Sequence, residues 1–191
     1  MTNDWAGKAG DDYTERNMVF PTIMQRKEVF SQILKDIEFE TVYEVGCNVG
    51  HNLRAIKWDR PRTVICGAEI NQAARLQAMK FGCIVDDIME PLKLSPFDLV
   101  FCCGVLIHTN PKDLRDLLLR MNLLSQRYIL LMEYFNAEPV EIDYREDLRL
   151  WKRDFGSFFM DHFPVKPVRS GFLWKPTSGM DNLTFWLFEK E

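Results

Sequence analysis

Val42-Tyr43-Glu44-Val45-Gly46-Cys47-Asn48-Val49-Gly50 is the stretch of sequence that decides the fold. Its apolar first part predicts a short buried strand with an acidic residue, Glu44, at its carboxyl end. Gly46 lets the backbone turn sharply and approach a ligand, because glycine has no Cβ atom. Gly50 allows close contact where the next helix begins, at about 51–58. The stretch therefore predicts a strand, a tight turn and a helix in direct succession.

A second apolar run, Thr63 to Ile70, also ends in a carboxylate, that of Glu69. Glu69 stands 23 residues after Gly46. In Rossmann-type folds an acidic residue about 20 residues beyond the glycine turn binds a ribose. The sequence therefore predicts that the chain binds a cofactor containing a nucleoside.

The glycine turn favours one such cofactor over another. A dinucleotide fold carries Gly-x-Gly-x-x-Gly to admit a pyrophosphate at the helix N-terminus, but Asn48 stands two residues after Gly46. Glu44, two residues before Gly46, would also repel a pyrophosphate. It suits a positively charged group, such as the amino group or sulfonium of S-adenosylmethionine. The charge of Glu44 therefore argues against NAD.

Composition sets further bounds on the protein. At 191 residues with 47% hydrophobic residues, the chain is expected to form one domain with a substantial core. A net charge of −4 makes nucleic acid an unlikely partner. The spacing of the five cysteines matches no known metal site or disulfide framework, so no bound metal is expected. Cysteines without disulfide spacing are consistent with a location in the reducing cytoplasm. No signal peptide and no membrane span are expected. We expect a monomer or homodimer.

Hydrophobic periodicity predicts alternating strands and helices, hence a parallel sheet with right-handed crossovers. A polar segment is expected to about residue 153, followed by a helix and an antiparallel hairpin. The expected strands are 41–45, 63–70, 83–85, 97–103, 127–133, 165–174 and 182–189. The expected helices are 22–37, 51–58, 72–80, 111–124 and 154–163, with Asn71 capping the third, Pro111 in the first turn of the fourth, and a turn at 176–179.

Between residues 40 and 135, this order of signals resembles the class I S-adenosylmethionine-dependent methyltransferases. The resemblance implies an α/β fold: a single Rossmann-like methyltransferase domain with a mostly parallel seven-stranded sheet, helices on both faces and an antiparallel terminal hairpin. Residues 1–20 would be an N-terminal arm or lid, and 21–191 the domain, with a substrate-covering insertion around 135–155. A narrower likeness, to the methylases associated with pseudaminic acid biosynthesis, is carried by Trp5-Ala6-Gly7, Tyr13-Thr14-Glu15-Arg16-Asn17, Gly104-Val105-Leu106-Ile107-His108, Glu133-Tyr134-Phe135-Asn136 and Lys152-Arg153-Asp154-Phe155-Gly156.

The resemblance also implies roles for individual residues toward S-adenosylmethionine. Glu44 and the loop of Gly46, Cys47, Asn48 and Gly50 would hold the methionine part. Glu69 would accept both ribose hydroxyls, and Ile70 would lie against the adenine. Asp87 with Ile88 would meet the adenine amino group and ring, although Asp86 is an alternative to Asp87. Cys103 and Gly104 would lie near the transferable methyl.

His108 and Tyr134 are the candidate catalytic residues. His108 follows the fourth strand at the carboxyl edge of the sheet, where ligands bind in open α/β folds. An imidazole with an ordinary pKa near ~6.5 accepts a proton well from a hydroxyl or amine. The alternative is that His108 caps the helix that begins near Asn110.

Two further groups are candidates for the binding of cofactor or acceptor. Tyr13, Arg16 and Asn17 are expected in a lid, with Arg16 pairing with the cofactor carboxylate; a surface helix turn is the alternative. Tyr144, Arg145, Lys152 and Arg153, together with Glu133 and Tyr134, are expected around the acceptor, although solvated ion pairs are an alternative.

The predicted function is transfer of a methyl group from S-adenosylmethionine to a small, acidic or hydroxyl-rich metabolite such as a sugar or sugar nucleotide, with S-adenosylhomocysteine as product. The acceptor atom stays open. The alternatives are a nucleic-acid methyltransferase and a cofactor-binding module without catalysis.

Overall fold

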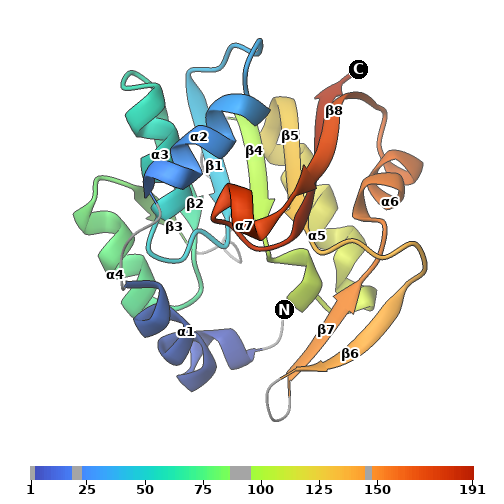
Figure 1. The fold of residues 1–191 in the computed structure, drawn as a ribbon, viewed down its shortest axis with the longest axis horizontal. Helices are drawn as coiled ribbons and strands as arrows, with labels where there is room; N and C mark the ends of the chain where they lie inside the picture. Colours follow the sequence, from blue (N-terminus) through green and yellow to red (C-terminus); the bar gives the residue numbers. More distant parts are fainter. Residues whose placement is uncertain (1–2, 19–22, 87–95, 145–147) are drawn as a thin grey trace.

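The computed structural model describes residues 3–18, 23–86, 96–144 and 148–191 (Figure 1). Its main sheet has seven strands in the order β3-β2-β1-β4-β5-β9-β8. The first five strands in the chain are parallel, and β9 runs antiparallel to both β5 and β8. The strands are β1 (Thr41–Val45), β2 (Val64–Ala68), β3 (Ile84–Asp86), β4 (Phe97–Cys103), β5 (Ser125–Glu133), β8 (Val165–Leu173) and β9 (Leu183–Lys190). The predicted α/β fold with its antiparallel hairpin is confirmed.

Helices cover both faces of this sheet (Figure 1). Side chains of β4 alternate between two cores: Phe101 packs with Phe30 on one face, and Val100 contributes to the other. Strands covered on both faces are apolar throughout, which is why β4 is a continuous apolar run. The first face carries α2 (Ile23–Ile33), α3 (His51–Asp59) and α4 (Gln72–Lys80), and the second carries α5 (Pro111–Leu124) and α6 (Phe155–His162).

The helix boundaries signalled by capping residues are confirmed. The Asn71 side chain accepts the Ala74 N–H at 2.9 Å at the start of α4. Asn110 caps α5 in the same way, with Pro111 in the first turn, where a missing N–H costs nothing. Gly82, with φ +81°, follows the end of α4 as expected for a glycine after a helix.

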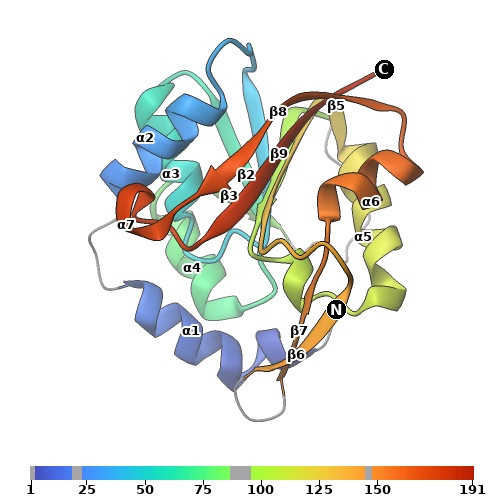
Figure 2. The ribbon, with the colours of Figure 1, turned by 45° about the vertical axis from the view of Figure 1, so that its right-hand side comes forward.

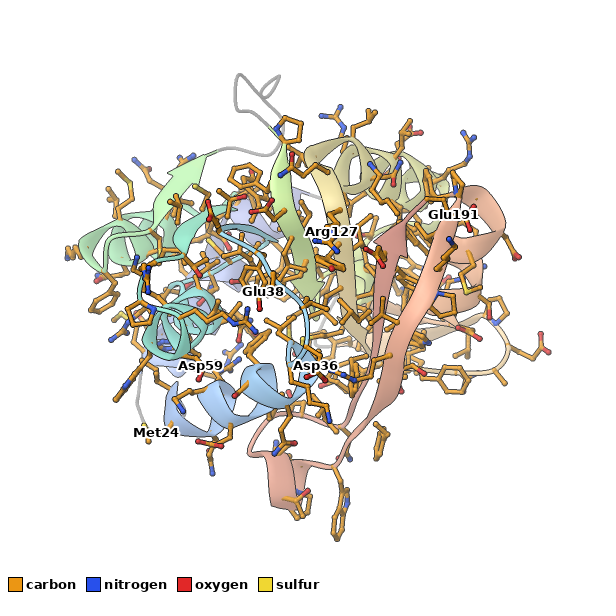
Figure 3. The ribbon with its side chains drawn as sticks, turned by 90° about the horizontal axis from the view of Figure 1, so that it is seen from above. Met24, Asp36, Glu38, Asp59, Arg127 and Glu191 are labelled. Carbon is orange, nitrogen blue, oxygen red and sulfur yellow. The ribbon has the colours of Figure 1, made fainter. Side chains whose placement is uncertain are left out.

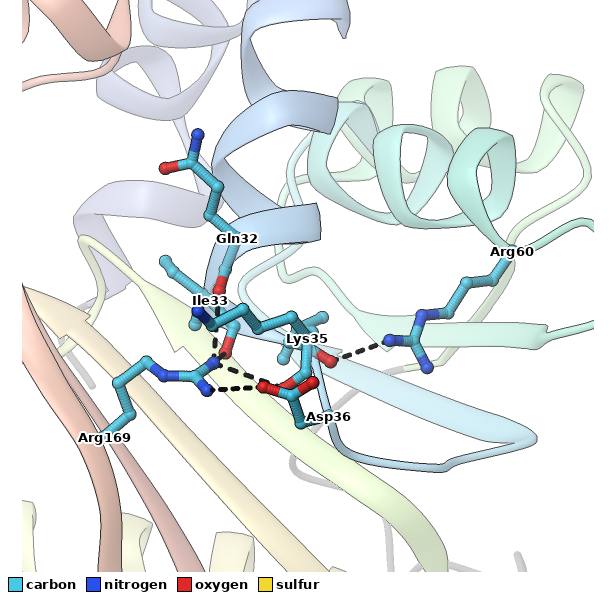
Figure 4. A network of polar contacts seen from close by, with 7 residues as sticks. Gln32, Ile33, Lys35, Asp36, Arg60 and Arg169 are labelled. Carbon is cyan, nitrogen blue, oxygen red and sulfur yellow. Dashed lines mark hydrogen bonds and ion pairs between the residues drawn. The ribbon is translucent and has the colours of Figure 1, made fainter.

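The first helix of the domain, α2, is shorter than predicted, because it ends at Ile33 and not at Ile37. Asp36 has a positive φ of +65°, which breaks the helical path. Two arginines from distant parts of the chain bind the exposed carbonyl oxygens there (Figure 4). Arg169 of β8 donates to the oxygens of Gln32, Ile33 and Lys35, and Arg60 donates to those of Leu34 and Ile37.

The segment expected to be merely polar up to residue 153 contains a separate two-stranded sheet. Its strands are β6 (Val140–Tyr144) and β7 (Leu148–Lys152), which pair antiparallel. The apolar positions of β6 alternate with charged ones, which is the pattern of a half-buried strand and which the sequence analysis overlooked. A short helix, α7 (Lys175–Ser178), also replaces the turn predicted at 176–179.

The N-terminal segment and this hairpin lie at the same end of the molecule, at the carboxyl edge of the main sheet (Figure 2). The segment consists of η1 (Asn3–Ala6) and α1 (Lys8–Met18). Figure 3 looks onto the opposite end, where Asp36 and Glu38 precede β1 and Arg127 lies in the first part of β5. None of the helices in the described ranges is long and apolar enough to cross a membrane.

Candidate functional site

A cavity of about 250 Å³ lies at the carboxyl edge of the sheet, where the strand order reverses between β1 and β4. Open α/β sheets bind ligands at this switch point. The N-terminal segment, the hairpin and the loop before β9 complete its wall. The structure places the following predicted site residues in its lining: Tyr13, Glu44, Gly46, Cys47, Asn48, Glu69, Ile70, Cys103, Gly104, His108, Tyr134 and Tyr144.

The loop after β1 forms one wall of the cavity by means of an unusual backbone. Gly46 and Asn48 have positive φ values of +70° and +46°. A Cβ atom at Gly46 would lie 2.6 Å from the Val105 side chain, so only glycine fits there. Gly50 is outside the cavity lining, and a Cβ atom there would lie 2.9 Å from the Cys83 sulfur, so glycine is needed for close packing; its contact with the cofactor stays a prediction.

Glu44 presents an unsatisfied carboxylate oxygen inside this site. Its side chain is 1% exposed, and one oxygen accepts a 2.6 Å hydrogen bond from Asn52. The other oxygen, Oε2, is buried and has no hydrogen-bond partner among the described residues. Burial raises the pKa of Glu44 to about 8. A buried acceptor without a partner marks a place where a ligand that donates hydrogen bonds fits.

Arg26 is the cation in the cavity that the sequence analysis missed. It lines the cavity from α2 and donates a hydrogen bond to the Asn52 side chain, which in turn donates to Glu44. The predicted cation, Arg16, is exposed, lies over the Tyr13 ring at 5.9 Å and is outside the lining. No sequence pattern distinguishes the two arginines, because their orientation depends on how α1 and α2 pack.

Glu69 joins the β1 loop to the start of α4. Its two oxygens accept the backbone N–H groups of Asn48 and Asn71, each at 2.7 Å. Burial raises its pKa, although these hydrogen bonds act in the opposite direction. The backbone N–H of Ile70 also donates to this carboxylate and lowers its pKa. Since a carboxylate has roughly four acceptor positions, the carboxylate still has room to accept a hydrogen bond from a ligand.

The N-terminal helix is bound to the same loops. Asp11 accepts a hydrogen bond from the Asn71 side chain at 2.8 Å, and buried Thr14 accepts one from Asn48 at 3.2 Å. Trp5 of η1 also lines the cavity. Trp5 and Thr14 occur in the stretches that carry the resemblance, but no site role was predicted from the sequence for either of them or for Asp11.

His108 lies in the short turn η2 (Leu106–His108) and lines the cavity. Asn110 caps α5, so the alternative that His108 caps this helix is wrong. Desolvation lowers the pKa of His108 to about 4, which leaves the imidazole neutral at pH 7. Its buried Nδ1 has no partner among the described residues. The group is therefore a weaker base than the ordinary pKa predicts.

Tyr134 also lines the cavity, at the end of β5. Burial and the neighbouring Asp181 carboxylate raise its pKa, and its hydroxyl hydrogen-bonds to Asp181. Lys175 forms a 2.8 Å ion pair with the same carboxylate. The Tyr134 proton is therefore held by a carboxylate in this arrangement.

The predicted acceptor-binding cations lie elsewhere. The Lys152 ammonium is 5.3 Å from the centre of the Tyr134 ring, and the Arg153 guanidinium is 3.9 Å from that of Phe158. Neither residue is in the cavity lining, whereas Tyr144 is, so acceptor binding by Lys152 and Arg153 stays a prediction. Arg145, Asp87 and Ile88 lie outside the described residues, and so does the side chain of Asp86.

Glu133 was expected beside the acceptor, but it supports the loop after β4 instead. Its carboxylate is fully buried and accepts the N–H groups of Val105, Leu106 and Ile107 at 2.9, 2.9 and 3.4 Å. Burial raises its pKa to about 7. Glu133 therefore holds η2, and with it His108, in position. Within the described ranges no cluster of three or more His, Cys, Asp or Glu side chains is placed to hold a metal ion.

Solved structures of other proteins align with this fold, although their sequences differ from this one. No family model and no curated protein matches the sequence, so nothing links it to the methylases of pseudaminic acid biosynthesis. Magnesium protoporphyrin IX methyltransferase from Synechocystis PCC 6803, solved with S-adenosylmethionine, aligns with a TM-score of 0.69 and 12% identity over 99% of this chain and 94% of that chain. The 1,6-didemethyltoxoflavin-N1-methyltransferase from Burkholderia thailandensis aligns with a TM-score of 0.69 and 12% identity over 94% and 83%.

A glycopeptide N-methyltransferase solved with S-adenosylmethionine aligns with a TM-score of 0.66 and 10% identity, over 88% of this chain and 94% of that chain. Identities this low show the fold alone. The chain therefore has the Rossmann-like α/β fold of the class I S-adenosylmethionine-dependent methyltransferases.

Proposed function

We propose that the protein is a methyltransferase that uses S-adenosylmethionine to methylate a small molecule and releases S-adenosylhomocysteine. The observation that carries this proposal is the buried Oε2 of Glu44, an acceptor without a partner at the switch point of a methyltransferase fold. A cofactor with an ammonium and a sulfonium group supplies what this carboxylate lacks. A pyrophosphate, in contrast, would place negative charge against it.

The lining residues fit the parts of this cofactor. Glu44 would face its amino group, and Arg26 its carboxylate. Glu69 would take the ribose hydroxyls at the acceptor positions that its backbone donors leave open. The Gly46–Asn48 turn would hold the methionine part, and Ile70 would lie against the adenine. The adenine contacts of Asp87 and Ile88 remain a proposal from the resemblance.

The chemistry itself needs little from the protein beyond orientation and exclusion of water. When bound, the cofactor supplies an electrophilic methyl group. Transfer forms a bond from an acceptor oxygen or nitrogen to that carbon and breaks its bond to sulfur, and the acceptor proton passes to solvent. Cys103, Gly104, His108 and Tyr134 surround the space for the acceptor. Because His108 is neutral and weakly basic, its proposed role is to position the acceptor.

The remaining parts of the predicted function stay proposals, and one of them loses support. The idea of an acidic acceptor depended on Arg145, Lys152 and Arg153; of the two that the structure describes, Arg153 packs on Phe158 outside the lining, and Lys152, itself outside the lining, lies over the ring of Tyr134, which does line the cavity. The likeness to the methylases of pseudaminic acid biosynthesis is retained as a proposal about the type of methylase and not about its acceptor. We also retain residues 1–20 as an N-terminal arm or lid, a cytoplasmic location, and a monomeric or homodimeric state.

A thermal-shift measurement tests the cofactor. With S-adenosylmethionine or S-adenosylhomocysteine at about 100 times the dissociation constant, binding adds about 2.7 kcal/mol of stability. For a chain of this size that raises the melting temperature by about 5–10 °C. NAD is expected to cause no shift. A shift with NAD and none with S-adenosylmethionine would contradict the proposal.

Two arginines on neighbouring helices provide a matched comparison. Arg26→Gln is expected to weaken S-adenosylhomocysteine binding by about tenfold to a hundredfold, because a charge-assisted hydrogen bond contributes about 1.5–3 kcal/mol. Arg16→Gln is expected to change it less than twofold, since Arg16 is outside the cavity lining. Isothermal calorimetry measures both. The assignment of Arg26 fails if Arg16→Gln is the substitution that weakens binding.

Two alternative functions are distinguished by other assays. Release of S-adenosylhomocysteine with any acceptor excludes a cofactor-binding module without catalysis. Binding to RNA or DNA that falls steeply with salt would favour a nucleic-acid methyltransferase. The net charge of −4 argues against the latter.

A further inference from the structure

Three aromatic rings from three separate segments meet at one side of the cavity: Trp5 of η1, His108 of η2 and Tyr144 of β6. The centre of the His108 ring is 4.3 Å from that of Trp5 and 5.9 Å from that of Tyr144. Leu150 of β7, the strand that packs against η2, lines the same side. We call these four residues the aromatic wall. It offers flat apolar surface and contains no carboxyl, ammonium or guanidinium group.

Charge is distributed unevenly around the cavity. The charged residues of its lining are Arg26, Glu44, Glu69 and Asp181, which lie on α2, β1, the end of β2 and the loop before β9. None of them belongs to the aromatic wall. Among the described residues the lining therefore has three carboxyl groups against one guanidinium. An anionic acceptor would lose its hydration beside these carboxyl groups, which is costly, and the Lys152 ammonium, 5.3 Å from the Tyr134 ring centre, is outside the lining.

One polar group in the aromatic wall still needs a partner. The Nδ1 atom of His108 is buried and makes no hydrogen bond to a described residue. Buried polar atoms in folded proteins are almost always hydrogen-bonded. Burial lowers the pKa of His108 to about 4, so the ring has no positive charge at pH 7 to attract an anion. Its Nδ1 can hydrogen-bond to a neutral polar group such as a hydroxyl, which donates or accepts according to the tautomer of the ring.

We propose that the methyl acceptor is a flat, uncharged ring compound that packs against Trp5 and Tyr144 and hydrogen-bonds to His108 through an O–H or N–H group. This inference rests on the proposed function, because it takes the aromatic wall as the acceptor side of the site. It also replaces the acidic or sugar-like acceptor expected from the sequence.

Four probes separate ring shape from charge. Calorimetry with saturating S-adenosylhomocysteine would compare 2-naphthol (flat and uncharged), 2-naphthoate (flat and anionic), methyl glucoside (uncharged, without an aromatic ring) and glucuronate (anionic, without an aromatic ring). We expect 2-naphthol to bind at least tenfold more tightly than each of the other three. Equal or tighter binding of any of the other three, or no binding of 2-naphthol, overturns the inference.

Variants locate the binding in the aromatic wall. Tyr144→Ala and His108→Ala are each expected to weaken 2-naphthol binding at least fivefold and to change S-adenosylhomocysteine binding less than twofold. The retained cofactor affinity also shows that the variants fold. His162→Ala, an exposed histidine on α6 outside the lining, is the control and should change neither. Unchanged 2-naphthol binding in both wall variants overturns the inference.

The cofactor titration in the same experiment keeps the two proposals apart. If S-adenosylhomocysteine does not bind, the proposed function itself fails. If it binds and 2-naphthol shows no preference, only the inference about the acceptor fails.

Discussion

Replacing Glu44 with glutamine is expected to weaken S-adenosylmethionine binding at least a hundredfold while making the ligand-free protein more stable at pH 8.5. Glutamine has nearly the same shape and can still accept the hydrogen bond from Asn52. It lacks the negative charge that would pair with the cofactor. It also removes the cost of a carboxylate that is buried with one oxygen unsatisfied.

The effect on stability depends on pH in a defined direction. The pKa of Glu44 is raised from 4.5 to about 8 in the folded protein. The protonated carboxyl is therefore favoured by folding, and the wild type loses stability as the pH rises from about 4.5 through about 8. Each unit of pKa shift corresponds to about 1.4 kcal/mol. We expect Glu44→Gln to melt about 5 °C or more above the wild type at pH 8.5, with the difference shrinking toward pH 5.

Titration calorimetry at pH 6.5 and 8.5 measures the affinity for the cofactor, and scanning calorimetry at the same pH values measures the melting temperature. Wild-type affinity for the cofactor should rise between these values, because the ionised carboxylate binds it, whereas the variant should show no such rise. Glu38→Gln, at the opposite end of the molecule (Figure 3), is the control and should change neither property. Cofactor affinity in Glu44→Gln within twofold of the wild type would refute the role of Glu44.

Removing the Glu133 carboxylate is expected to cause the largest loss of stability. Glu133→Ala leaves the N–H groups of Val105, Leu106 and Ile107 without their acceptor in a buried turn. Each unsatisfied donor costs about 1–3 kcal/mol. We expect a loss of about 3 kcal/mol or more in the free energy of unfolding, measured by urea denaturation.

A surface carboxylate on the neighbouring strand provides the control for Glu133. Glu189 pairs with Arg127, and both side chains are more than one third exposed. Glu189→Ala is expected to cost less than about 1 kcal/mol, as exposed ion pairs do. A similarly small loss in Glu133→Ala would show that the loop after β4 does not depend on this carboxylate.

The sequence allowed prediction of those parts of the fold that depend on local chemistry. The turn from β1 to α3 follows from Gly46, and the start of α4 from the cap at Asn71, because each acts on residues close to it in the chain. The buried strands were recognisable because both sheet faces are covered, which makes them continuously apolar.

What the sequence could not predict depends on contacts between distant residues. The carbonyl oxygens at the end of α2 accept hydrogen bonds from Arg169, which lies more than 130 residues away in the chain. Whether Arg16 or Arg26 enters the cavity depends on the packing of α1 and α2 against the sheet edge. The role of Glu133 as a support for η2 likewise requires knowing that β5 ends beside the loop after β4.

A crystal structure of the complex with S-adenosylhomocysteine tests the central claim most directly. The account predicts the ribose hydroxyls within hydrogen-bond distance of the Glu69 carboxylate and the amino group beside Glu44. A nucleoside bound away from both carboxylates, or a cavity that stays empty at saturating ligand, would contradict it.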